Sequence, residues 1–174
     1  MTGLAILLAF FFAGQDPPAT HARLTRAAIV GIEKNFDGRF SRPYSPDAFD
    51  LLGATRGVYL EGYGAVFTTE LNLIISPNLS PFHQSFTNLE KARIHDRKIQ
   101  HLASLKQQMR EMLIYSAVSL ENLPPSEQVV LAVSLFHYSW EDSSGLPSQV
   151  VMQAERQKLL SNATRDTAIR MVEF

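Results

Sequence analysis

The most regular pattern of apolar and polar positions in the chain predicts one long amphipathic helix over residues 88–121. Thr87 and Glu90 stand three apart, which is the spacing of a capping box, where a hydroxyl and a carboxylate bind free backbone N–H groups at a helix start. Apolar residues then recur at intervals of three and four until Leu123, which two prolines follow. At 1.5 Å per residue, about 30 residues give a helix about 45 Å long, more than a compact domain of this size covers. We therefore expect one end of the helix to project, to bend or to contact a partner.

Alternating patterns predict strands on both sides of this helix. Gly62 and Gly64 lie between two β-rich runs and allow positive φ, so the runs form a hairpin. After the helix an apolar run predicts a central strand, the polar residues 141–147 predict a turn, and two more strands follow, with helix as a competitor from Gln153 onward. The predicted strands are residues 58–60, 65–74, 127–140, 148–155 and 168–174.

Two shorter helices are predicted before the hairpin. Residues 23–36 place apolar side chains at helical spacing, and Asp37 and Gly38 provide a stop. Ser45 and Pro46 have the order of a capping hydroxyl followed by a first-turn proline, so they indicate a second helix that ends at Gly53.

Together these elements predict an α+β fold of two layers, in which a mostly antiparallel sheet packs against the long helix and the short N-terminal helix. The chain has 174 residues, of which 45% are hydrophobic and 19% are charged, as in an ordinary globular domain. A segment of about 150 residues buries enough surface to hold one core without disulfides. We therefore expect residues 23–174 to form a single domain.

Residues 1–22 resemble a signal peptide in pattern. Leu4 to Ala13 form an unbroken apolar run, about half the length that a membrane-spanning helix needs, and a polar, proline-containing stretch follows. Small residues at Thr20 and Ala22 favour cleavage near Ala22, although no basic residue precedes the run. We expect a secreted or periplasmic protein without a stable membrane anchor. The alternative is a cytoplasmic protein whose first helix is apolar and buried.

Composition excludes several classes of function. The chain has no cysteine, which removes disulfides, thiol nucleophiles and cysteine-bound zinc. Loss of residues 1–22 removes only Asp16 from 17 acidic residues, so 16 acids balance 16 bases, without the basic excess of a nucleic-acid binder. His95 and His101 are six apart, a spacing that points them in different directions on a helix. We predict no metal, no cofactor and no nucleic acid.

Candidates for a ligand-binding site lie on the hairpin and among the histidines. Thr68, Glu70 and Asn72 share the polar side of the second predicted strand, where they could hold a ligand or simply face solvent. His83 and His137 are further candidates. Six cations of the long helix spread around its circumference, so we expect them to be solvated. They are Lys91, Arg93, Arg97, Lys98, Lys106 and Arg110.

Two hypotheses of function follow. The first is an exported, non-catalytic module that binds a ligand through the polar side of the sheet, or that contacts a protein partner or itself through the long helix 88–121. The second is a small extracytoplasmic, hydrolase-like enzyme in which Glu70 meets His83 or His137 only in the folded chain. No catalytic serine motif or phosphate-binding lysine motif occurs in the sequence.

Overall fold

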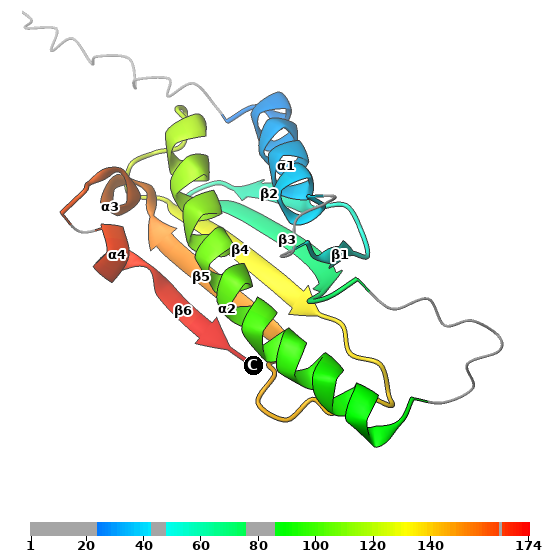
Figure 1. The fold of residues 1–174 in the computed structure, drawn as a ribbon. Coiled ribbons are helices and arrows are strands. Elements are labelled where there is room, and N and C mark those ends of the chain that lie inside the picture. The colour runs from blue at the N-terminus through cyan, green and yellow to red at the C-terminus, as the bar shows by residue number, and fades with distance from the viewer. Residues whose placement is uncertain (1–23, 43–47, 76–85, 164) are drawn as a thin grey trace, which may run out of the picture.

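The computed structural model describes residues 24–42, 48–75, 86–163 and 165–174 and confirms an α+β fold. One mixed sheet of six strands carries a long helix and a shorter N-terminal helix (Figure 1). The elements in chain order are α1 (Arg26–Phe40), β1 (Asp50–Leu51), β2 (Arg56–Leu60), β3 (Gly64–Asn72), α2 (Asn88–Ser119), β4 (Gln128–Leu135), β5 (Gln149–Glu155), α3 (Arg156–Leu160), α4 (Arg165–Ala168) and β6 (Arg170–Glu173).

The strands are ordered β1-β3-β4-β5-β6, and β2 pairs with β3 on the same side as β1. Four pairings are antiparallel, as expected, but β3 and β4 are parallel, with Ala65 opposite Val129 and Leu71 opposite Leu135. Parallel neighbours need a crossover connection, and α2 provides it. The sheet is therefore mostly antiparallel with one parallel seam at its centre.

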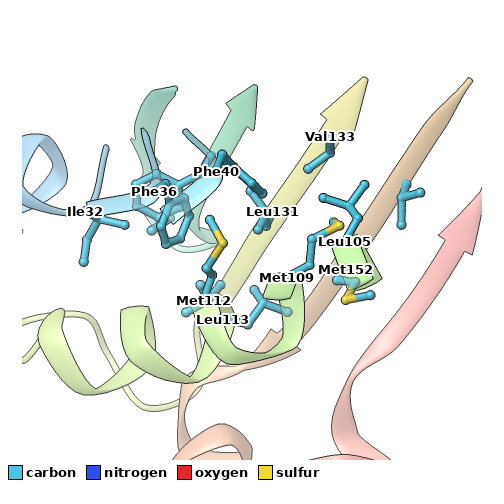
Figure 2. Packing of buried hydrophobic residues seen from close by; sticks show 14 of the residues in the cluster. Ile32, Phe36, Phe40, Leu105, Met109, Met112, Leu113, Leu131, Val133 and Met152 are labelled. Carbon is cyan, nitrogen blue, oxygen red and sulfur yellow. The ribbon is translucent and has the colours of Figure 1, made fainter. Parts of the chain in front are cut away.

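Helices α1 and α2 both lie on one face of the sheet, where the core forms (Figure 1). Figure 2 shows Phe36 of α1 and Met109 of α2 directed at the strands, where Leu131 and Met152 meet them. The rings of Phe36 and Phe67 make an edge contact, with centroids 5.3 Å apart. Each such side chain stabilises the fold by about 1.5–3 kcal/mol on burial, so this layer is the main source of stability.

The ends of α2 are fixed by specific contacts. At its start the predicted capping box is present: the Thr87 backbone N–H donates to Glu90 Oε2 at 2.8 Å, and the Glu90 N–H donates to Thr87 Oγ1 at 3.3 Å. At its end the Arg156 guanidinium donates to the Ala117 and Leu123 carbonyls at 2.9 and 3.1 Å. A cation at this position also complements the helix dipole.

The first turns of α2, which extend past the sheet, contact another part of the same chain. The helix continues past the end of β4 alongside the connection between β4 and β5 (Figure 1). There His95 Nδ1 lies 2.9 Å from the Asp142 carbonyl, and Lys98 Nζ donates to the Phe136 carbonyl at 3.3 Å. These contacts join the first turns of α2, which project beyond the sheet, to the β4–β5 connection.

The first predicted helix is shifted along the chain. Helix α1 is capped by the Thr25 side chain and continues through Asp37 and Gly38 to Phe40. Phe40 is fully buried, and Asp37 Oδ1 accepts the Thr55 N–H at 2.8 Å, so the expected stop signal instead fastens the helix to the sheet. Burial of Phe40 thus extends the helix.

The second predicted helix is wrong over residues 50–51, which form a strand. Ser45 and Pro46 lie outside the described residues, but Asp50–Leu51 forms strand β1, paired with Asn72 and Leu71. Main-chain pairing with β3 decides the conformation of this stretch, and local capping signals carry no information about such pairing.

Strand β4 ends at Leu135, five residues before the end predicted for it. The Phe136 N–H still donates to the Leu71 carbonyl, and then the chain leaves the sheet. The Tyr138 ring makes an edge contact with Phe136 and stacks on Trp140, with centroids 4.9 and 5.4 Å apart. Aromatic residues that favour a strand here build a ring cluster instead. The last strand is confirmed over Arg170–Glu173, and α4 precedes it.

Candidate functional site

The strands present a second face that points away from α1 and α2. Inward residues of β4 such as Leu131 and Val133 are fully buried, whereas outward residues such as Thr68, Glu70 and Val58 are exposed. We call this surface the open face. It consists of Arg56, Val58, Leu60, Val66, Thr68, Glu70, Gln128, Val130, Ala132, Ser134, Gln149, Val151, Gln153, Glu155, Arg170, Val172 and Phe174.

A band of small apolar side chains crosses the middle of the open face from β2 to β6. The strand register places Val58 beside Val66 and Val130, and Ala132 beside Val151 and Val172. Charged residues stand outside the band, near opposite corners of the sheet. The open face therefore combines an apolar centre with a polar margin, which is the general anatomy of a protein interface.

Two of the predicted site residues meet on this face. Thr68 and Glu70 line a hollow of about 260 Å³ together with Arg56 and Ser134. Sequence analysis missed Arg56 and Ser134, because only the register of β2 and β4 against β3 brings them there. A guanidinium, a carboxylate and two hydroxyls can bind polar groups. The described lining holds neither a second carboxylate nor a histidine, so it lacks a general acid–base pair.

A second hollow of about 350 Å³ lies over the other edge of the open face. Its lining is mostly apolar or uncharged, and Arg170 is its one described charged residue. The lining residues are Gln149, Val151, Gln153, Arg170, Val172 and Phe174. Phe174 is 68% exposed, so a large ring is available for contact here.

The third residue of the predicted row, Asn72, does not line the hollow. Asn72 points to the same side of β3 as Glu70 but is only 1% exposed, at the position where β1 pairs with β3. His83 lies outside the described residues.

His137 belongs to a different cluster, on the helical side of the sheet. Its Nε2 lies 3.2 Å from the Pro147 carbonyl, and its Nδ1 lies 3.9 Å from Glu141 Oε2. The same Glu141 oxygen binds Lys98 of α2 and accepts the Tyr138 N–H. Glu70 points from the open face instead, so the structure does not bring Glu70 and His137 together.

Lys98 and Glu141 are buried, contrary to the expectations that the cations of the helix are solvated and that the turn at residues 141–147 is too polar to enter the core. The two side chains are 1% and 3% exposed. The sequence holds one signal for this position, because Lys98 continues the apolar stripe of Leu102, Leu105 and Met109 at helical spacing. A lysine in such a stripe predicts either a buried partner or a snorkelling side chain.

Asp142 is the described group with a clear electrostatic perturbation. Its pKa lies below the ordinary value because the Ser144 side chain and the Ser144 backbone N–H donate to the carboxylate, and because His95 is close. The backbone N–H bond is 2.9 Å long. This carboxylate is fully exposed, so it orders the turn rather than forming a reactive site.

Three further observations bear on the class of protein. In the described ranges, no group of three or more His, Asp or Glu side chains could hold a metal ion. None of the helices described is long and apolar enough to span a bilayer. Comparisons with protein-family models, curated proteins and solved structures found no match.

Proposed function

We propose that the protein is an exported, non-catalytic interaction module that binds a protein partner through the open face of its sheet. The observation that carries the proposal is the placement of α1 and α2 on one face, which leaves an apolar band with charged corners on the other. The two hollows on this face are wide open, so the surface suits a protein better than a small molecule, because small ligands need concave sites that enclose most of their surface.

The positions of the candidate acid–base residues favour binding over catalysis. The hollow around Glu70 contains one carboxylate among its described residues, and His137 lies on the helical side, where its Nε2 is 3.2 Å from the Pro147 carbonyl. The hydrolase-like alternative, with Glu70 near His137, gains no support from this arrangement. The long helix is a weaker docking surface, since its apolar stripe packs against the sheet and its first turns contact the β4–β5 connection.

A photo-crosslinking amino acid at Val58 tests the binding surface. Val58 is 49% exposed on the open face, and Val118, which is 56% exposed on α2, is the matched control position. We expect adducts from position 58 and none from position 118 when the protein is expressed in its own compartment. A second substitution, Ala132→Lys, places a charge in the middle of the apolar band and is expected to abolish the adducts. Equal labelling from both positions, or none from either, would reject the proposal.

The proposal that the protein is exported depends on residues 1–22, and a separate experiment tests it. We expect the mature protein outside the cytoplasm, with an N-terminus near residue 23, as determined by fractionation and N-terminal sequencing. A full-length protein retained in the cytoplasm would contradict export but would leave the binding surface unaffected.

A further inference from the structure

We propose that the open face binds a second copy of this chain, sheet against sheet, with the strands of the two copies crossing at nearly a right angle. This inference rests on the proposed function, because it names the occupant of the same surface. The argument depends on how the charges of the open face are arranged by the strand register.

Each of two opposite corners of the open face carries one arginine and one glutamate in diagonal positions. At the β2 edge, Arg56 is opposite Thr68, and Glu70 lies two residues further along β3. At the β6 edge, Arg170 is opposite Gln153, and Glu155 lies two residues further along β5. Asp50 of β1, opposite Asn72, adds one carboxylate on the same side of the sheet, beyond the end of β2. The other side chains of the open face are uncharged, so the two arginines and two glutamates set the charge pattern within it.

This layout is complementary to itself. With strands about 4.8 Å apart and alternate residues about 6.6 Å apart, a two-fold axis along either diagonal of the face places every arginine over a glutamate of the second copy. An axis parallel to the strands would instead bring Arg56 close to the Arg170 of the second copy. A diagonal axis turns the strands of one copy by about 90° relative to the other, which is one of the two common modes of sheet packing.

Most of these charges are available for a partner. Within the described part of the chain, Arg56, Glu70 and Arg170 form no ion pair. Glu155 holds Lys158 Nζ at 2.8 Å, but both side chains are exposed. An exposed pair of this kind contributes about 0–1 kcal/mol, so it competes weakly with a contact that excludes water.

The size and chemistry of the face also suit a second copy. Five strands and four rows of outward residues span roughly 24 by 20 Å, so two copies cover roughly 1,000 Å² in total, the lower limit for a specific interface. Val130 and Ala132 of β4 straddle the centre, where a two-fold axis would pass. We therefore expect a weak dimer whose centre is apolar and whose corners carry paired charges.

Sedimentation velocity of the mature chain over a range of concentrations tests the charge pairing. We expect a reversible dimer, and Arg56→Glu with Arg170→Glu is expected to raise its dissociation constant at least about tenfold. Inverting all four charges, with Glu70→Arg and Glu155→Arg added, should restore the dimer for either diagonal axis. The inverted protein should not pair with the unaltered one. Arg93→Glu with Arg97→Glu, exposed on α2, is the matched control and should leave dimerisation unchanged.

The absence of native cysteine allows a geometric test with the same protein. Ala132→Cys should be linked to its own copy by a short bis-maleimide, whereas Val118→Cys on α2 should not. A chain that stays monomeric at every concentration, or a four-charge inversion that fails to restore the dimer, would overturn this inference. If the probe at Val58 then labels a different protein, the second copy is rejected while the proposed function stands; if it labels nothing, both fail.

Discussion

Lys98 Nζ lies 2.5 Å from Glu141 Oε2, and the fold removes both side chains almost completely from water. The pair joins the N-terminal half of α2 to the connection between β4 and β5. Burial of two charges costs several kcal/mol, which their attraction offsets only while both are present. This ion pair therefore adds to the contacts of His95 and of Lys98 with carbonyl groups that hold this end of the long helix.

Removing one partner of this pair is expected to be costly. Lys98→Met leaves the carboxylate of Glu141 buried without its cation, and we expect a loss of about 3–5 kcal/mol in the free energy of unfolding. The double variant Lys98→Met with Glu141→Leu removes both charges and should recover most of that loss. Urea denaturation followed by circular dichroism measures both values. Equal destabilisation by the single and double variants would show that the pair is not the source of the effect.

Two glycines of the β2–β3 turn should differ in their tolerance of a side chain. Gly64 has φ +144°, and a Cβ there would lie 2.0 Å from the Gln128 carbonyl oxygen, so Gly64→Ala must displace the parallel seam. Gly62 has φ +80° but open space around it, so Gly62→Ala costs only the left-handed backbone, about 1–2 kcal/mol. We expect the first substitution to cost clearly more, as measured by thermal unfolding. Similar losses for the two variants would contradict the predicted clash.

Ser144→Ala should move the titration of Asp142. The substitution removes the side-chain hydrogen bond that contributes most to the lowered pKa of this carboxyl, so that pKa should rise toward its ordinary value. A carboxyl with a lowered pKa stabilises the fold above its unfolded-state pKa, and the contribution is lost as pH falls through the folded-state value. The stability difference between the two proteins should therefore be present at neutral pH and vanish in acid.

Carboxyl NMR as a function of pH measures the shift directly. Ser143→Ala is the control, because the structure gives its side chain no part in lowering the pKa of Asp142. An unchanged Asp142 titration in Ser144→Ala would contradict the assigned cause.

Arg156→Met tests the cap at the C-terminal end of α2. The guanidinium donates to the Ala117 and Leu123 carbonyls, and methionine keeps most of the apolar stem without those hydrogen bonds. We expect a loss of about 1.5–3 kcal/mol in the free energy of unfolding, measured with urea. Arg93→Met on the exposed side of α2 should stay within about 0.5 kcal/mol. A similar small effect for both variants would remove Arg156 from the determinants of stability.

Sequence patterns predicted the elements whose signals are local. The hydroxyl and carboxylate of Thr87 and Glu90 cap α2 as expected, and the glycines of the β2–β3 turn have the positive φ that their positions indicated. The alternation along β3 also placed Thr68 and Glu70 on the outward side. These features depend on residues a few positions apart, so the sequence contains the information directly.

The features that sequence analysis missed depend on pairing between distant segments. Asp50 is in a strand because β3 offers it a partner, and the parallel alignment of Ala65 with Val129 spans the whole of α2. Arg56 and Ser134 join the hollow of Glu70 only through the register of three strands. Lys98 is buried because the chain after β4 supplies Glu141, 43 residues later. Periodicity within one element cannot report such partners.

The parallel seam has a consequence for how the chain reaches its native state. Strands β1 to β3 come from one contiguous stretch of the chain, and strands β4 to β6 come from another. Each group of three strands can therefore form its hydrogen bonds through pairing between segments that are close in sequence. The seam between Ala65 and Val129 must wait until α2 has crossed the sheet, because loop closure over this distance precedes any gain from pairing. We expect closure of the seam to limit the folding rate, and until then the two inner strand edges stay available for mispairing.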